Sequence, residues 1–159
     1  MSTRTPGDLA AFLSRRAARA RLLPAEQPTR TVEEAARALG VSPRQIIKSL
    51  LFCAEDGTCV LAIVRGDQRV DPARLRAACG GTPLKLAPAR QVLAVTGYPA
   101  GATPPVGHSI PLRVLVDSAV LAEPLVYGGG GDERTMLEIS PEEIVRLTGA
   151  LVAAIAQST

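Results

Sequence analysis

Two apolar runs separated by a short polar loop constrain the fold of this chain more than any other feature. Residues 50–54 (LLFCA) and 59–64 (CVLAIV) flank the sequence Glu-Asp-Gly-Thr at 55–58. Short continuous apolar runs bounded by turn residues are typical of buried strands. A loop of this size that contains glycine joins two such strands as a β-hairpin. The sequence therefore predicts a buried hairpin here.

Four capping boxes predict helix starts, and glycines predict where several helices end. The third box opens what we expect to be a short helix through Ile46 and Ile47, and Gly40 ends the helix before it. The boxes lie at residues 5–8, 31–34, 42–45 and 140–143.

The rest of the chain mixes strands and helices without strict alternation. We expect helices after Asp71 and after Pro88, a loop at 98–111, and a strand or extended linker at 22–28. Further strands are expected at 84–86, 112–116, 124–127 and 135–139. This order favours one α+β domain over residues 1–159, with a mixed or largely antiparallel sheet.

Composition excludes several classes of protein. Hydrophobic residues are 47% and charged residues 21% of the 159, which excludes a disordered tail. Aromatic residues are only 3%, so base stacking on an aromatic platform is not expected to dominate binding. No apolar run reaches the roughly 18 residues of a membrane span, and no signal-peptide pattern opens the chain. We therefore expect a cytoplasmic protein without membrane partners.

Charge is distributed unevenly along the chain. Residues 1–50 carry nine Lys or Arg against four Asp or Glu, whereas residues 51–159 carry nine against eleven. Only Lys48 and Lys85 are lysines. A basic N-terminal third is compatible with a phosphate-rich partner and equally with a solvated helix face.

The cysteines do not form a recognisable metal or redox motif. Cys53, Cys59 and Cys79 are odd in number, lack CxxC spacing, and have only His108 as a potential partner for zinc. Because Cys53 and Cys59 lie in apolar runs, we expect reduced structural thiols and no metal or other cofactor.

Familiar catalytic motifs are also missing. The Pro/Gly-rich loop at 97–108 is therefore the strongest candidate for a functional site. The chain has no GxSxG elbow, HExxH sequence or P-loop. Glycines let backbone approach a ligand and prolines fix the loop, so its amides can stabilise a developing oxyanion. A plain structural connector is the alternative.

Lys48 and His108 are the side chains that could add chemistry to such a loop. Lys48 follows a short predicted helix and precedes a buried strand, where its ammonium could hold a phosphate or carboxylate. It could instead cap a helix C-terminus. His108 could act as an acid or base, or simply face solvent.

The segment 31–50 supports a DNA-binding interpretation when taken alone. Two predicted helices around a glycine turn resemble a helix-turn-helix, with Arg44, Gln45 and Lys48 on the second helix. That helix would be only about six residues long, which leaves little length for reading bases.

Combined with motifs later in the chain, the same segment resembles the YbaK family of aminoacyl-tRNA deacylases, which includes the editing domain of bacterial prolyl-tRNA synthetases. The resemblance extends from about Leu9 to Ala150. Its features, in order, are residues 31–41, 45–50, 66–71, 101–108, 114–117 and 139–141.

The resemblance implies a fold with a barrel-like mixed sheet surrounded by helices. It also implies a protein that acts in trans on the 3′ end of a mischarged aminoacyl-tRNA and needs no metal. It implies that Lys48 holds the tRNA 3′ end and that Gly101 and its loop shape the aminoacyl pocket through backbone groups. The implied substrate is tRNA-Pro or a similar tRNA that carries Ala, Cys, Ser or Thr, and an aminoacyl-tRNA synthetase is a further partner that we expect. The implied substrate-binding residues are Thr31, Ser49, Gly97, Ala102, Thr103, Pro104, Pro105, Gly107 and His108.

Two features depart from the family pattern. Ala102 stands where the family loop commonly has a second glycine, and residues 128–134 are unusually rich in glycine. Two other functions remain open at this stage: the helix-turn-helix DNA-binding protein, and a tRNA- or synthetase-binding module without catalysis.

Overall fold

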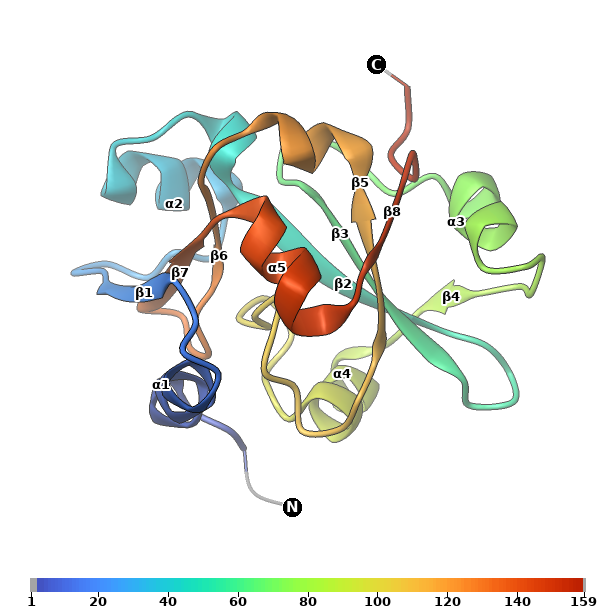
Figure 1. The fold of residues 1–159 in the computed structure, drawn as a ribbon, viewed down its shortest axis with the longest axis horizontal. Coiled ribbons are helices and arrows are strands. Elements are labelled where there is room, and N and C mark those ends of the chain that lie inside the picture. The colour runs from blue at the N-terminus through green and yellow to red at the C-terminus, as the bar shows by residue number, and fades with distance from the viewer. Residues whose placement is uncertain (1–2, 159) are drawn as a thin grey trace.

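The computed structural model describes residues 3–158 and contains two β-sheets with helices packed around them (Figure 1). The larger sheet has the strand order β4-β2-β3-β5-β8. Strands β2 and β3 pair antiparallel, as the predicted hairpin requires, whereas β3–β5 and β5–β8 pair parallel. Its strands are β2 (Ile47–Cys53), β3 (Cys59–Arg65), β4 (Lys85–Leu86), β5 (Arg113–Asp117) and β8 (Leu151–Ala153).

The smaller sheet is antiparallel and has the order β1-β7-β6. Its strands are β1 (Ala20–Pro24), β6 (Val126–Gly129) and β7 (Thr135–Ile139). An isolated parallel bridge between Ile46 and Tyr127 connects this sheet to the start of β2. The mixed, largely antiparallel α+β fold is thus confirmed, although the strand pairings among the described residues leave two linked sheets and do not close a barrel.

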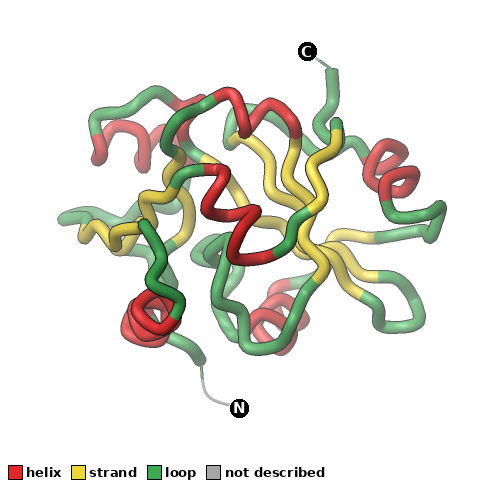
Figure 2. Tube along the Cα trace, viewed as in Figure 1, coloured by secondary structure: helices red, strands yellow, loops and turns green. Residues whose placement is uncertain are grey.

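The helices cover the sheets from several sides (Figure 2). Three of the predicted capping boxes form with both hydrogen bonds, at Thr5, Thr31 and Ser42. The helices are α1 (Pro6–Arg15), α2 (Val32–Leu39), α3 (Pro72–Ala78), α4 (Ala89–Thr96) and α5 (Pro141–Thr148), with 3₁₀ turns η1 (Pro43–Gln45) and η2 (Ser118–Ala122). None of the helices within residues 3–158 has the length and apolarity to cross a bilayer.

The helix-turn-helix interpretation is wrong. The segment after Ser42 forms only the three-residue turn η1, and Ile46 and Ile47 are already extended. Lys48 therefore lies on strand β2 and not at a helix C-terminus. Apolar pairing of 47–53 with β3 outweighs the local helix signal, so no recognition helix exists here.

The expectation of reduced thiols is also wrong for two of the three cysteines. Cys53 and Cys59 lie directly opposite each other in the β2–β3 register and form a disulfide. Cys79, at the end of α3, is free. The hairpin register brings the pair together, which spacing alone did not reveal.

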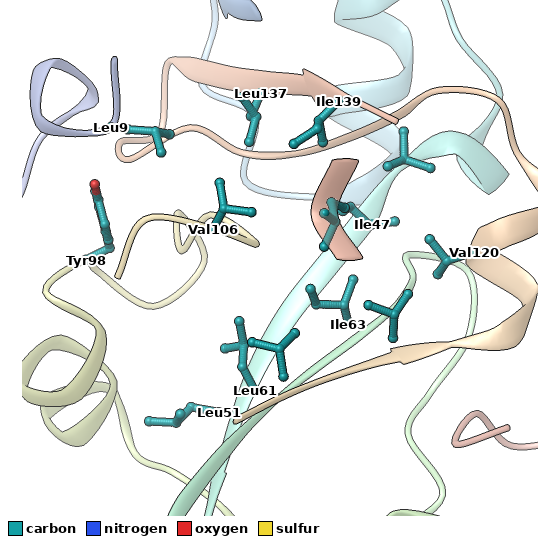
Figure 3. Close-up of a cluster of buried hydrophobic side chains, with 14 of the residues drawn as sticks. Leu9, Ile47, Leu51, Leu61, Ile63, Tyr98, Val106, Val120, Leu137 and Ile139 are labelled. Carbon is teal, nitrogen blue, oxygen red and sulfur yellow. The ribbon is translucent and has the colours of Figure 1, made fainter. Parts of the chain in front are cut away.

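The main hydrophobic core lies between the sheets, α1 and the 97–108 loop (Figure 3). Leu9 from α1, Val106 from the loop and Leu137 from β7 are fully buried there. Ile47 at the start of β2 joins the same cluster. Because Val106 is an anchor in this core, the loop is held against the sheets.

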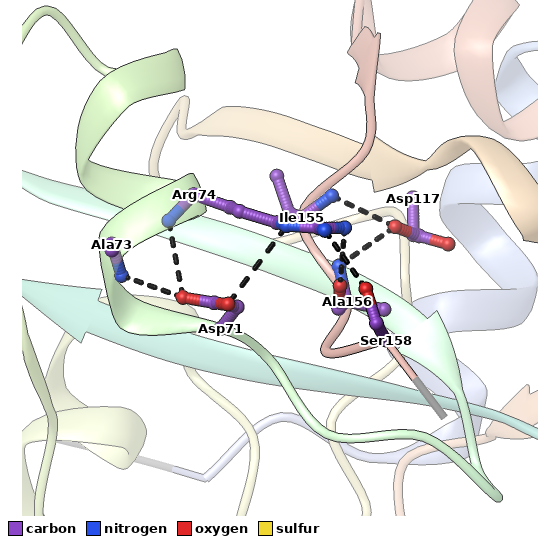
Figure 4. Close-up of polar contacts among 7 residues, drawn as sticks. All are labelled: Asp71, Ala73, Arg74, Asp117, Ile155, Ala156 and Ser158. Atoms are coloured by element: carbon purple, nitrogen blue, oxygen red, sulfur yellow. Dashed lines mark hydrogen bonds and ion pairs between the residues drawn. The ribbon is translucent and has the colours of Figure 1, made fainter.

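A polar clasp fixes the chain after β8 (Figure 4). The Asp117 carboxylate accepts hydrogen bonds from the N–H groups of Ile155 and Ala156, both at 2.8 Å. Arg74 donates to the Ala156 carbonyl and to the Ser158 hydroxyl. Charge-assisted bonds of this kind hold the C-terminal segment beside α3.

Candidate functional site

A cavity of about 250 Å³ lies where the start of β2, the start of α2, the 101–103 loop and the β6–β7 strands meet. It brings together five residues that the sequence singled out: Thr31, Lys48, Ser49, Gly101 and Thr103. The other lining residues are Thr29, Arg30, Val32, Ala35, Ile46, Ile47, Leu50, Gly129 and Met136. Lys48 and the glycine loop, some fifty positions apart, therefore line one cavity.

Lys48 is the lysine that lines this cavity. It is opposite Val64 in the β2–β3 register and is only partly exposed. Among residues 3–158, no carboxylate forms an ion pair with its ammonium. Burial lowers the pKa of Lys48, the Arg69 guanidinium lowers it further, and Asp67 partly opposes both. A desolvated cation without a partner favours an anionic ligand.

Ser49 and Thr31 add hydroxyl groups that differ in whether the protein supplies a hydrogen-bond partner. The Ser49 Oγ is buried and has no hydrogen-bond partner among the described residues. The Thr31 Oγ1 accepts from the Glu34 N–H at 3.0 Å as the N-cap of α2. Ser49 therefore has a buried hydroxyl that is unpaired among the described residues, whereas the Thr31 hydroxyl fixes the helix start.

The loop presents backbone to the cavity at Gly101 and Thr103. Gly101 has φ +86°, and a Cβ there would meet no atom within 4 Å, so its α-carbon faces open space. The Thr103 hydroxyl donates to the Pro99 carbonyl at 3.0 Å and braces the turn. Within the described chain, neither the Gly101 nor the Thr103 N–H donates to another protein group. Both amides can therefore serve an oxygen of a ligand.

The glycine-rich segment 128–134 now has a physical explanation. A Cβ on Gly129 would lie 2.6 Å from the Thr103 carbonyl oxygen and 2.7 Å from Ala102 backbone atoms. The Gly131 N–H donates to the Ala102 carbonyl at 3.0 Å. Glycine is required because the β6–β7 backbone packs directly on the loop that lines the cavity.

Sequence reasoning missed the residues that form the apolar side of the cavity. Met136 is buried, and its Sδ accepts a hydrogen bond from the Thr29 hydroxyl at 3.4 Å. Ile47 and Ala35 complete this side and are also buried. Strand alternation marks Met136 as a buried core position, but only the β1–β7–β6 pairing brings it to the cavity.

Three predicted binding residues lie away from the cavity. Gly97 is the C-cap of α4, where a Cβ would clash with Arg4. Gly107 packs on Leu9, and His108 lines a separate cavity with it. The His108 Nε2 is 2.7 Å from the Pro104 carbonyl oxygen, and burial lowers its pKa. The geometry does not support direct substrate contact by these three residues.

The other predicted residues of the loop lie behind the cavity wall and do not line it. Ala102, Pro104 and Pro105 are buried and do not line the Lys48 cavity. Ala102 instead faces a neighbouring cavity shared with Gly101 and Arg30. Within the described chain, no three His, Cys, Asp or Glu side chains converge in the manner of a metal site.

The fold and cavity define a class: a small α+β domain whose Lys48 cavity is lined by backbone groups, hydroxyls and an ammonium that is unpaired within residues 3–158. The model of the aminoacyl-tRNA editing domain family matches residues 26–147. Since this is well over half of the chain, the protein belongs to that family.

Individual relatives agree with this assignment. Proline–tRNA ligase of Nitratidesulfovibrio vulgaris strain DP4 is 43% identical over 97 residues, which is 59% of this chain and 17% of the ligase. The chain thus spans about a sixth of that protein's length. The uncharacterized Bacillus subtilis protein YwhH is 31% identical over 119 residues, 75% of each chain.

A solved structure extends the similarity to the whole fold. The crystal structure of a protein proposed to be a trans-editing enzyme for prolyl tRNA synthetase superposes with a TM-score of 0.90 at 33% identity. The superposition covers 99% of this chain and all of the other.

Proposed function

We propose that this protein hydrolyses the ester bond of mischarged aminoacyl-tRNA in trans, with tRNA-Pro carrying a small amino acid as the substrate class. The observation that carries the proposal is the Lys48 ammonium, unpaired within the described chain, at the edge of a cavity lined by Gly101 and Thr103. An anionic 3′ end next to a small acyl group matches this combination of charge and space.

The reaction needs little from catalytic side chains. Water attacks the carbonyl carbon, the bond from that carbon to the ribose oxygen breaks, and the ribose oxygen receives a proton. The products are the free amino acid and uncharged tRNA. An aminoacyl ester is already activated, so positioning of water and stabilisation of the oxyanion contribute most of the rate.

Each group of the cavity has a proposed role in this reaction. Lys48 holds the terminal phosphate, and the Gly101 and Thr103 amides donate to the developing oxyanion. The Ser49 hydroxyl binds a polar group of the aminoacyl moiety. The neighbouring ribose hydroxyl of the substrate orients the attacking water.

The size of the cavity and the relatives support the substrate class. A volume of about 250 Å³ lies below the roughly 300–1,000 Å³ of sites for drug-sized ligands, which suits a small acyl group. The similarity to proline–tRNA ligases favours tRNA-Pro, a synthetase as an associated protein, and a cytoplasmic location.

The test is single-turnover deacylation of tRNA-Pro charged with Ala, Cys, Ser or Thr. We expect wild-type protein to release at least one amino acid, and Lys48→Ala to lower that rate at subsaturating protein by about tenfold or more, the loss expected for one hydrogen bond to a charged group. Lys85→Ala is the matched control, because Lys85 is the only other lysine and is exposed on β4.

Two results would contradict the proposal. Tight tRNA binding without release of any amino acid would leave a binding module in place of an enzyme. An unchanged rate and affinity in Lys48→Ala would remove Lys48 from the mechanism.

A further inference from the structure

The segments around the cavity differ in charge. One group of segments, made of η1, the start of β2 and the turn after β3, carries Arg44, Lys48 and Arg69. Lys48 lines the cavity, and the Arg69 guanidinium is near enough to lower the pKa of Lys48. Arg44 and Arg69 are exposed. Within residues 3–158, neither guanidinium forms a hydrogen bond or ion pair. We call these three residues the basic rim.

Backbone pairing holds the basic rim together. Ile47 is opposite Arg65 in the hairpin register, and the Gly66 N–H donates to the Ile46 carbonyl at 2.6 Å. The turn after Arg65 therefore lies beside the start of β2, directly after η1. The Gln157 N–H donates to the Arg69 carbonyl at 2.7 Å. The C-terminal segment that the polar clasp holds therefore also fixes the turn after Arg65.

The carboxylate in the turn after β3, Asp67, is paired with an arginine. Asp67 accepts two hydrogen bonds from Arg65, at 2.6 and 3.0 Å. The Arg65 bond is the main reason that the pKa of Asp67 is lowered, and Arg44 contributes to the same shift. Asp67 therefore compensates only part of the positive charge of Lys48, Arg44 and Arg69.

The other charged segments beside the cavity, which we call the acidic side, carry a net negative charge. The acidic side is formed by residues 26–37 and 132–134, which carry five carboxylates and three guanidiniums. Arg30, the cation nearest the cavity on this side, is paired with Glu133 at 2.9 Å. A polyanion is repelled from this side and attracted to the basic rim.

Resting on the proposed function, we propose that the RNA strand leaves the cavity across the basic rim, with backbone phosphates contacting Arg44 and Arg69 beyond the group held by Lys48. The strand then avoids the carboxylates of the acidic side. Because these contacts are to phosphates, they contribute affinity without reading sequence.

The experiment compares charge reversals in the basic rim and on the acidic side. The double variant Arg44→Glu/Arg69→Glu should weaken tRNA binding about tenfold or more at low salt and reduce the slope of log affinity against log salt by roughly 1.4, or 0.7 per single-strand contact. Arg37→Glu, an exposed arginine on α2 on the acidic side, is the control and should change affinity less than about twofold.

A minimal substrate separates this inference from the proposed function. Hydrolysis of an aminoacyl ester of adenosine, which lacks the preceding phosphates, should proceed equally in wild type and in the double variant. Equal loss of tRNA affinity in Arg37→Glu and in the double variant would overturn the basic rim. Failure of the wild type to hydrolyse any aminoacyl ester would overturn the proposed function, while a selective loss of tRNA binding would still support the rim.

Discussion

Glu143 and Lys48 are two charged groups withdrawn from water, and they differ in what surrounds them. The Glu143 carboxylate is 1% exposed and accepts hydrogen bonds from the Arg19 N–H at 2.7 Å and from Arg146 at 2.6 and 2.8 Å. Lys48 has no such partner within the described chain. One charge is satisfied by the fold, and the other is unpaired among the described residues.

The pKa values of both groups are lowered, but the two shifts have opposite meanings. Bonding to Arg146 lowers the pKa of Glu143 to about 2, which means that the fold stabilises its charged form. Burial lowers the pKa of Lys48, which means that the fold destabilises its charged form. The Glu143 carboxylate therefore stabilises the folded state, whereas the partly desolvated ammonium of Lys48 destabilises it.

The largest expected effect is loss of the satisfied charge. Glu143→Gln should lower the free energy of unfolding by about 3 kcal/mol, because the bonds to Arg146 and to the Arg19 N–H lose their charge assistance at a buried position. Urea unfolding measures the change. Glu142→Gln, its exposed neighbour on α5, should change stability by less than about 0.5 kcal/mol.

The pH dependence of that difference sharpens the comparison. The pKa of Glu143 falls from an ordinary 4.5 to about 2 on folding, so its stabilisation is complete above pH 4.5 and is lost as pH falls toward 2. The stability gap between wild type and Glu143→Gln should therefore persist from pH 7 to about 5 and close between pH 4.5 and 2. A gap that stayed constant to pH 2 would show that packing, and not charge, is what the variant loses.

The hydrogen bonds of Glu143 show which contacts a local sequence pattern predicts and which it does not. The pattern at 140–143 predicts a capping box, and the Ser140 Oγ does accept from the Glu143 N–H at 3.1 Å. The carboxylate does not complete the box and instead bonds to Arg19, which is 124 positions away. Capping bonds within four residues are predictable because the geometry is local, whereas a partner set by tertiary packing is not.

The candidate site divides in the same way. The family resemblance singled out Lys48, Ser49, Gly101 and Thr103, and the structure brings all four to one cavity. It could not show that Met136 lines that cavity, because this depends on how the two sheets meet. The same limit hid the Cys53–Cys59 disulfide, which depends on hairpin register.

The smallest expected effect concerns the unpartnered charge. Lys48→Met keeps the length of the apolar stem and removes the desolvated ammonium, so the free energy of unfolding at pH 7 should rise, by less than about 1 kcal/mol. Because the pKa of Lys48 is lowered on folding, the penalty applies wherever the folded protein is protonated and fades as pH rises toward the ordinary value of 10.5. Unfolding in urea at pH 7 and pH 10 measures both statements, with Lys85→Met as the exposed control. A clear loss of stability in Lys48→Met would show that the ammonium has a protein partner after all, and the contrast with Glu143 would disappear.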